Sequence, residues 1–294
     1  MAPSRCPYTG SDVSSVSVRS DATIFEPYLS RWALSVDGMP FRSRSSDLVF
    51  VRSRSGPAIL KVPFETEERL GGALMHWWGG DGAARVFHFD AASGTAVLER
   101  ASGPRDLRRM SERGEDAEAV RILCRAASRL HRAGRGPRPS ELVPLDAWFA
   151  ALPRAAQHRG GPFASGWAVA KRLLAQDRHT VALHGDIHHG NVLDFGTRGW
   201  LAIDPKHVFG DRTFDYVNIL RNPDVEAMPD PARFERTVAI VVSEAGLDRR
   251  RYLEWTYAFA MLSAAWNLED DSAPSVDFEI AKLAAVMLGS IETS

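Results

Sequence analysis

The chain has few cysteines and no long apolar run, and each shortage excludes a class of protein. Its two cysteines, Cys6 and Cys124, are too few and too far apart for a disulfide framework or a cysteine zinc site. No run approaches the roughly 18 apolar residues of a membrane span. The start of the chain also lacks the basic and then apolar pattern of a secretory signal. We therefore expect a protein of the reducing cytoplasm that spans no membrane.

No sign of charge dominates either. The 36 Lys and Arg residues and 37 Asp and Glu residues give a formal net charge of -1. This balance predicts no global attraction to nucleic acid or to a membrane surface, so a charged ligand must be recognised by a local cluster. The 294 residues, 45% of them hydrophobic, suffice for two lobes with a sizeable core. There is no internal repeat, and we expect a monomer.

Sequence patterns divide the chain into three parts. Residues 1–23 have little periodicity and predict a flexible tail. Residues 24–100 predict a short helix over 26–34, then a small antiparallel sheet with one helix over 65–78, because strand-like segments alternate with turns. Residues 101–294 predict a mainly helical unit, because apolar stripes recur at helical spacing. The predicted strands are 37–41, 47–53, 57–62, 84–90 and 95–101, and the later helices are 116–133, 142–152, 166–176, 231–246, 249–268 and 278–291.

The stretch "LHGDIHHGNVLDFGTRGWLAIDP", residues 183–205, concentrates the chemically active side chains. His184 and His188 have the spacing of two zinc ligands on one helical face. The residues between them include no glutamate that could serve a metalloprotease, and Gly185 and Gly190 disfavour a helix. The pattern therefore disfavours a zinc site.

The same stretch fits the protein-kinase catalytic loop, H-R-D-L-x-x-x-N, because His184, Asp186 and Asn191 have the same separations. In that loop the aspartate accepts the proton of the substrate hydroxyl and the asparagine binds Mg²⁺. The segments "VLDF" and "WLAI" around "GTRG" predict a hairpin that returns Asp204 to the neighbourhood of Asn191. A carboxylate and an amide oxygen suit Mg²⁺ better than zinc. We therefore predict that Asp186 is catalytic and that Asn191 and Asp204 bind Mg²⁺.

The first part of the chain supplies the other pieces of a nucleotide site. "PAILKV" places Lys61 at the end of a strand, as V-A-I-K does in kinases, where the lysine binds the α- and β-phosphates. The next helix carries Glu67 and Glu68, and either can hold this lysine. ATP would then lie between the two parts of the chain, with its adenine against residues 99–103, including Glu99 and Ala101.

These motifs resemble those of the aminoglycoside phosphotransferases, within them the streptomycin 6-phosphotransferase and hydroxyurea-kinase branch. "LHGDIHHGNVL", "GWLAIDP" and "SAAWN" carry the resemblance, which covers roughly residues 25–290. It implies an α+β, two-lobed protein-kinase-like fold, with a small antiparallel-sheet N-lobe over 24–100 and a mainly helical C-lobe over 101–294. It also implies transfer of the γ-phosphoryl group of ATP, with Mg²⁺, to an aminoglycoside, and the 6-hydroxyl of streptomycin is the expected acceptor.

The resemblance assigns two further residues and shows two departures. Asp215 matches an aspartate that holds the catalytic loop by hydrogen bonds, and His184 is expected to brace that loop rather than to react. No G-x-G-x-x-G is present, and "SRSSD" at residues 43–47 stands in its place. Backbone N–H groups there, with the hydroxyls of Ser45 and Ser46, are expected to hold the β-phosphate. Lys206 occupies the glycine position of D-F-G.

A cationic acceptor such as streptomycin, with its two guanidinium groups, calls for an anionic site. The run "WNLEDD" offers Trp266 for stacking and Glu269 and Asp270 as carboxylates. With Asp186 and Asp215 these residues make the predicted acceptor site. The other interpretation of the run is the solvated end of a helix. Further acidic candidates are Asp211, Asp224 and Glu226.

Three other functions fit parts of the pattern. A protein kinase is disfavoured because Gly185 replaces the arginine of H-R-D, A-P-E is absent, and the segment from Asp204 to Asp215 is too short to dock a peptide. A small-molecule kinase acting on hydroxyurea or on a metabolic hydroxyl stays open, because the shared machinery does not name the acceptor. A non-catalytic nucleotide-binding module is disfavoured because Lys61 and the catalytic-loop residues occur together. The choice between ATP and GTP stays open as well.

Overall fold

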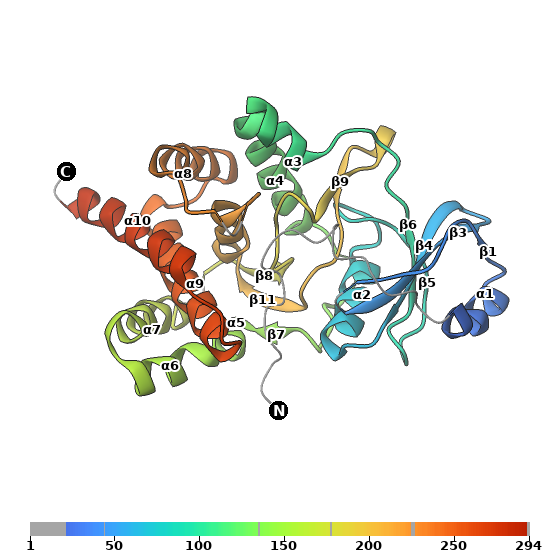
Figure 1. Cartoon of the computed structure of the whole chain (residues 1–294), viewed down its shortest axis with the longest axis horizontal. Helices are drawn as coiled ribbons and strands as arrows, with labels where there is room; N and C mark the ends of the chain where they lie inside the picture. The colour runs from blue at the N-terminus through green and yellow to red at the C-terminus, as the bar shows by residue number, and fades with distance from the viewer. Residues whose placement is uncertain (1–21, 44, 135, 177, 225–226, 293–294) are drawn as a thin grey trace.

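The computed structural model describes residues 22–43, 45–134, 136–176, 178–224 and 227–292, so the tail predicted over 1–23 lies almost wholly outside the described residues. Figure 1 shows a lobe built on one sheet beside a larger lobe of helices with two small sheets. The predicted α+β, two-lobed architecture is therefore confirmed. None of the helices in the described parts is long and apolar enough to cross a membrane.

The N-lobe is built on an antiparallel sheet with the order β1-β3-β4-β6-β5, and β2 also pairs with β3. Alternate residues of its long strands, such as Val49, Val51 and Leu60, are fully buried against Phe25. The strand predicted over 37–41 is present only at Phe41, because residues 37–40 lie between β1 and β2 and Pro40 has no N–H to donate to a ladder. The elements are η1 (Ala22–Phe25), α1 (Glu26–Arg31), β1 (Ser35–Val36), β2 (Phe41–Arg42), β3 (Ser46–Ser53), β4 (Gly56–Pro63), α2 (Thr66–Trp78), β5 (Val86–Phe89) and β6 (Ala96–Glu99).

The C-lobe helices pack around α9, most of whose residues are buried. Edge-to-face contacts of 5.5–5.7 Å between ring centroids join Phe149, Phe214, Trp255 and Phe259 in its core. The helices are α3 (Leu107–Met110), η2 (Ser111–Glu115), α4 (Asp116–Leu130), α5 (Leu145–Trp148), α6 (Ala151–Arg159), α7 (Gly161–Leu174), η4 (Arg212–Arg221), α8 (Pro231–Ala245), α9 (Arg249–Glu269) and α10 (Ser275–Glu292).

Two small sheets complete the C-lobe. The hairpin of β9 (Val192–Asp194) and β10 (Trp200–Ala202), with η3 (Gly196–Arg198) at its turn, confirms the predicted hairpin. A second sheet has the order β7-β11-β8, formed by β7 (Val143–Pro144), β8 (Thr180–Leu183) and β11 (Val208–Asp211). The helix predicted over 142–152 is instead β7, α5 and the start of α6, because Pro144 is extended, with ψ of 151°. The sequence pattern did not predict β11.

Residues 100–106 connect β6 to α3 and form the hinge between the lobes. Asp194, whose side chain is 2% exposed, fastens this hinge to the β9–β10 hairpin. Arg105 donates to both carboxylate oxygens, at 2.7 and 3.1 Å, and its backbone N–H donates at 3.3 Å. The N–H of Gly103 donates to the backbone carbonyl of Asp194 at 2.8 Å. Any side chain at Gly103 would overlap the carboxylate. The hinge and the hairpin therefore form one packed unit.

We expect Asp194→Ala to lower the free energy of unfolding by about 2–3 kcal/mol, because it removes the shared acceptor of the Arg105 side chain and of the backbone N–H groups of Arg105 and Gly196. Urea denaturation measures this change. The matched control is Asp90→Ala, because Asp90 pairs with the largely exposed Arg31 at 3.3 Å. An exposed pair contributes about 0–1 kcal/mol. Equal losses in the two variants would contradict a structural role for the Asp194 contact.

Candidate active site

The predicted catalytic loop joins β8 to β9, and Gly185 shapes its turn. Gly185 has a φ of +76°, a conformation that favours glycine. A Cβ at this position would lie 3.0 Å from the Cβ of Lys206 and 3.2 Å from a methyl carbon of Val208. The absence of a side chain therefore lets the segment after Asp204 pass close to the loop.

His184 braces the loop from inside. Its Nδ1 accepts the backbone N–H of Asp186 at 3.2 Å, so Nε2 carries the proton and donates to the carbonyl of Ile203 at 2.8 Å. Burial lowers the pKa of the His184 ring, although Asp215 and Asp186 oppose this effect. The ring is therefore neutral near pH 7, and its contacts confirm the predicted brace.

Asp215, on η4, holds the loop by its backbone. Its carboxylate accepts the N–H of His184 at 2.9 Å and the N–H of Gly185 at 2.6 Å, and Nε2 of His131 lies 2.8 Å from it. Burial would raise the pKa of Asp215, but the hydrogen bond with His131 and nearby charges hold it below the usual value. The loop-holding prediction is confirmed. The predicted contact with the acceptor is wrong, because the Asp215 side chain is 0% exposed and both of its oxygens are used.

The carboxylate of Asp186, the predicted catalytic group, faces amide donors on both sides. Asn218 donates from Nδ2 to Oδ1 at 2.7 Å. Asn191 donates from Nδ2 to Oδ2 at 3.3 Å and to the Asp186 carbonyl at 3.0 Å. Sequence reasoning missed Asn218. Its one signal is its position three residues after Asp215 in "FDYVN".

The other two histidines of the loop pack around it. Nδ1 of His188 accepts the N–H of Gly190 at 3.0 Å, so its Nε2 carries the proton and lies 3.8 Å from Oδ2 of Asp186. His189 is 2% exposed, and neither of its ring nitrogens has a hydrogen-bond partner among the described residues. Burial, with the charge of Arg233, lowers the pKa of His189 to about 3. Both histidines are therefore packing groups in this conformation.

The hairpin brings Asn191 and Asp204 together, as predicted. Val192 pairs with Ala202, and the N–H of Ile203 donates to the carbonyl of Asn191 at 2.9 Å. Because Asp186 accepts from the Asn191 amide nitrogen, the Asn191 Oδ1 is left for another partner. This amide oxygen and the Asp204 carboxylate form an oxygen donor set, which fits Mg²⁺.

A buried group of charges surrounds Asp204. Lys61 pairs with both Glu68 and Asp204, which identifies Glu68 as its partner on α2. Nζ of Lys206, a residue to which the sequence pattern assigned no role, lies 3.9 Å from Glu68. Burial would lower the pKa of Lys61, but Asp204 and Glu68 hold it above its usual value. Burial would likewise raise the pKa of Asp204, but Lys61 and Lys206 hold it below its usual value. Lys61 and Asp204 are therefore both charged near pH 7.

The turn between β2 and β3 lies where a glycine-rich loop was expected, but its serines face inward. Ser45 is 4% exposed and Ser46 is 0% exposed. The Oγ of Ser43 accepts both of their backbone N–H groups, at 3.5 and 3.1 Å. Their N–H groups are therefore already used, whereas their buried hydroxyls have no hydrogen-bond partner among the described residues, so the expected contact with the β-phosphate stays a prediction for the hydroxyls alone.

The two residues expected beside adenine lie at the end of β6 and just after it. The carboxylate of Glu99 accepts the N–H of Arg85 at 3.1 Å and pairs with Arg198. Its side chain therefore fastens β6 to the β9–β10 hairpin, and the expected adenine contact at Glu99 stays a prediction that only its backbone could meet. Ala101 is half-buried and forms no hydrogen bond with the described residues, so it stays a predicted adenine contact.

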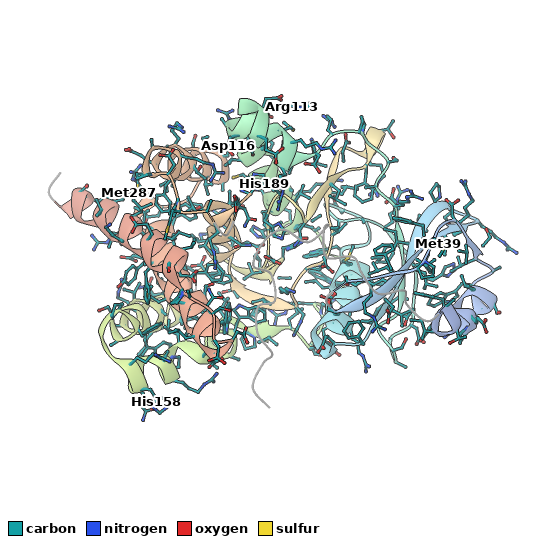
Figure 2. The ribbon with its side chains drawn as sticks, in the orientation of Figure 1. Met39, Arg113, Asp116, His158, His189 and Met287 are labelled. Carbon is teal, nitrogen blue, oxygen red and sulfur yellow. The ribbon has the colours of Figure 1, made fainter. Side chains whose placement is uncertain are left out.

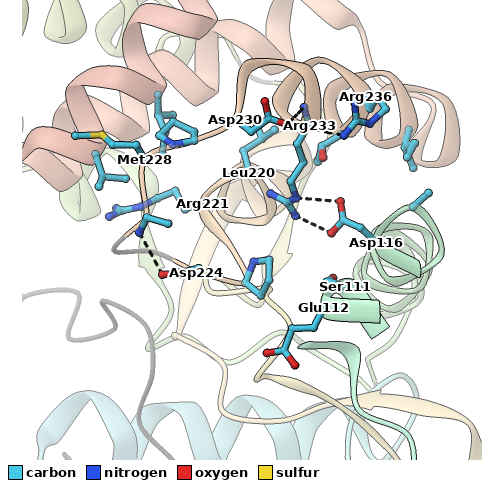
Figure 3. Close-up of a pocket in the computed structure, with 18 of the residues that line it drawn as sticks. Ser111, Glu112, Asp116, Leu220, Arg221, Asp224, Met228, Asp230, Arg233 and Arg236 are labelled. Carbon is cyan, nitrogen blue, oxygen red and sulfur yellow. Dashed lines mark hydrogen bonds and ion pairs between the residues drawn. The ribbon is translucent and has the colours of Figure 1, made fainter. Parts of the chain in front are cut away.

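A cavity of about 530 Å³ lies beside the catalytic loop in the C-lobe. η2, α4, the end of η4, α8 and α10 form its walls, and Figure 3 shows the side chains that line it. Arg233 donates to both oxygens of Asp116 at 2.9 Å across it. Asp116 interacts electrostatically with the buried ring of His189, which places the cavity next to the loop (Figure 2). Its charged lining residues are Glu112, Asp116, Asp224, Asp230, Arg221, Arg233 and Arg236.

The run predicted to bind the acceptor, "WNLEDD", lies elsewhere. Trp266 is 7% exposed and packs edge-on against Trp148 of α5, so it cannot stack on a guanidinium. Glu269 pairs with Arg154 of α6 at 3.1 Å, and Asp270 ends the helix in solvent. None of the three lines the cavity, so the stacking role predicted for Trp266 is wrong, and the acceptor contacts of Glu269 and Asp270 stay predictions. Of the further candidates, Asp224 lines the cavity, Asp211 is buried against Arg251, and Glu226 lies outside the described residues.

Comparison with known proteins defines the family. The model of the aminoglycoside/hydroxyurea antibiotic resistance kinase family matches residues 31–271. The chain belongs to this family of antibiotic resistance kinases. The kinase is 46% identical over 248 residues to a streptomycin 3''-kinase of Klebsiella pneumoniae, covering 82% of this chain and 91% of the relative. It is 32% identical over 279 residues to a streptomycin 6-kinase of Streptomyces glaucescens, covering 90% and 89%.

Solved structures agree on the fold of the kinase. A thermostable mutant of the aminoglycoside phosphotransferase APH(4)-Ia, in a ternary complex with ADP and hygromycin B, superposes with a TM-score of 0.60. It is 13% identical, and the match covers 90% of this chain and 98% of that one. The predicted kinase-like fold is confirmed, and family membership makes the chain a nucleotide-using phosphotransferase.

Gly71 offers a test of how α2 positions the charges of the kinase. A Cβ at Gly71 would lie 2.5 Å from the carbonyl oxygen of Pro205, the residue after Asp204. Gly71→Ala should therefore displace α2 and separate Glu68 from Lys61. We expect kcat to fall about tenfold or more, because small displacements of positioned charges are costly. The control is Gly289→Ala on α10, where a Cβ meets nothing within 4 Å. Steady-state kinetics would contradict this role of Gly71 if both variants kept wild-type kcat.

Proposed function

We propose that this kinase transfers the γ-phosphoryl group of ATP to a hydroxyl group of streptomycin and so inactivates the antibiotic. The observation that carries the proposal is a cavity with carboxylates on its wall at the end of η4, the helix whose Asn218 contacts Asp186, in a chain whose relatives include streptomycin kinases. A polycationic acceptor needs carboxylates close to the reacting group. Hydroxyurea, uncharged and much smaller, uses neither the volume nor the charge of this cavity.

The residues of the site divide the reaction between them. Lys61 neutralises charge on the ATP phosphates, held in place by Glu68. Asn191 and Asp204 would hold Mg²⁺, which when bound neutralises charge on the β- and γ-phosphate oxygens. Asp186 orients the acceptor hydroxyl and takes its proton. A bond forms between the hydroxyl oxygen and the γ-phosphorus, the bond from that phosphorus to the β–γ bridging oxygen breaks, and ADP leaves with the electron pair.

Within the cavity, Glu112 is the carboxylate best placed for a cationic acceptor. Asp116 is held by Arg233, and Asp230 caps the first turn of α8 by accepting from two backbone N–H groups. Glu112 is exposed on η2 and forms no ion pair within the described part of the chain. A guanidinium or ammonium group in the cavity would therefore find Glu112 without a competing cation.

The two hydroxyl groups under consideration lie on different rings of streptomycin. The 46% identical relative is a 3''-kinase, which favours the 3''-hydroxyl. The 32% identical relatives include 6-kinases, which keep the 6-hydroxyl expected from the sequence motifs as the second candidate. We propose the 3''-hydroxyl, because the higher identity spans most of both chains.

The test is an ADP-release assay with streptomycin, kanamycin and hydroxyurea as separate acceptors. We expect turnover with streptomycin, and the ³¹P–¹H correlation of the product should assign the phosphate to C3''. Asp186→Ala should lower kcat about 10³-fold with ATP affinity nearly unchanged, because it removes only the proton acceptor. No turnover with streptomycin would refute the acceptor, and a phosphate at C6 would refute the position alone.

A charge-removal variant tests the cavity as the acceptor site. We expect Glu112→Gln to raise KM for streptomycin about fivefold, the effect of about 1 kcal/mol for a partly exposed ion pair, with kcat and KM for ATP retained. Glu118→Gln is the matched control, because Glu118 lies on α4 outside the cavity and pairs with Arg125 at 3.3 Å. An unchanged KM in Glu112→Gln would place the cationic acceptor elsewhere.

A further inference from the structure

The 3₁₀ helix η4 connects three parts of the site along one line. Such helices turn once every three residues, so residues i, i+3 and i+6 lie on one face. In η4 this face carries Asp215, Asn218 and Arg221, the "D-x-x-N-x-x-R" of "DYVNILR". In an α-helix the same residues would diverge by about 60° for every three positions. Runs of 3₁₀ helix beyond three or four residues are uncommon, and η4 has ten.

Each residue of this row contacts a different part of the site. Asp215 binds the backbone of the catalytic loop. Asn218, one turn later, donates to Oδ1 of Asp186. Arg221, the last residue of η4, lines the cavity and forms an ion pair with Asp277 at 2.9 Å. The row therefore leads from the loop to the proposed acceptor site through Asn218.

The two carboxylate oxygens of Asp186 are held unequally. The 2.7 Å hydrogen bond from Asn218 to Oδ1 is short for an N–H donor. Oδ2 has a longer contact of 3.3 Å with Asn191, and His188 is 3.8 Å away, which is no hydrogen bond. An acceptor hydroxyl therefore competes with a weaker contact at Oδ2 than at Oδ1.

We propose that Asn218 is a positioning residue for phosphoryl transfer: its amide N–H holds Oδ1 of Asp186 and so leaves Oδ2 to face the acceptor hydroxyl. The inference rests on the proposed function only for the identity of the acceptor. Asn218 is half-buried, and its own backbone carbonyl accepts from the Asn222 side chain at 2.9 Å. The donor is thus fixed within the 3₁₀ helix before any acceptor enters.

Three variants separate hydrogen-bond donation from space filling. Asn218→Ala removes the donor and the volume, and Asn218→Asp keeps the volume but replaces the donor with a carboxylate. If donation matters, kcat falls about 10- to 100-fold in Asn218→Ala and at least as far in Asn218→Asp, whereas KM for ATP changes less than threefold. Asn222→Ala, which loosens the same helix without touching Asp186, should keep kcat within about threefold.

The outcomes separate this inference from the proposed function. Near-normal kcat in Asn218→Asp with a loss in Asn218→Ala shows space filling and overturns the inference, as does normal kcat in both variants. Melting temperatures are measured in parallel, and Asn222→Ala shows how much kcat responds to a loosened helix alone. If wild-type kinase does not phosphorylate streptomycin, the proposed function fails, and the same comparison is made on basal ATP hydrolysis, with water as acceptor.

Discussion

The buried carboxylate of Asp215 is the contact on which the active site depends. It accepts the N–H groups of His184 and Gly185, at a turn where Gly185 has a positive φ and no side chain to pack. Without this acceptor, both donors would be buried and unpaired, at a cost of about 1–3 kcal/mol each. His184 in turn donates from Nε2 to the carbonyl of Ile203, next to Asp204. Asp186 and the hairpin that carries Asn191 and Asp204 are therefore held in fixed positions relative to each other.

The second determinant of the site is a balance of buried charge. Lys61 and Lys206 lie against Glu68 and Asp204, and the opposite charges hold Lys61 and Asp204 in their ionised forms. Such a cluster is polarised before substrates arrive, so little reorganisation is needed when phosphate charge develops. Asp204 has a φ of +59°, which is uncommon for a residue with a side chain. Its ion pair with Lys61 and the hairpin hold it in this conformation.

The parts of the site that could be predicted from sequence depend on short-range geometry. The spacing of His184, Asp186 and Asn191 and the hairpin of β9 and β10 need only local turns, and both predictions agree with the structure. Burial depends on distant packing, and there the predictions failed. Trp266 was predicted to bind the acceptor, but on α9 it packs against Trp148 of α5. The local pattern also did not indicate that the side chain of Ser45 would be buried. Asn218 could not be found, because an apolar pattern does not distinguish a 3₁₀ helix from an α-helix.

The Asp194 contact has a mechanical consequence for the movement of the lobes. Asp194 lies between Asn191 and Asp204 in the chain, and it also grips the hinge at Gly103 and Arg105. A rotation about the hinge must therefore either carry the hairpin along as a rigid body or break an ion pair that has two hydrogen bonds. The first course costs far less. Opening of the cleft would then leave Asn191 and Asp204, the proposed Mg²⁺ ligands, at a constant separation.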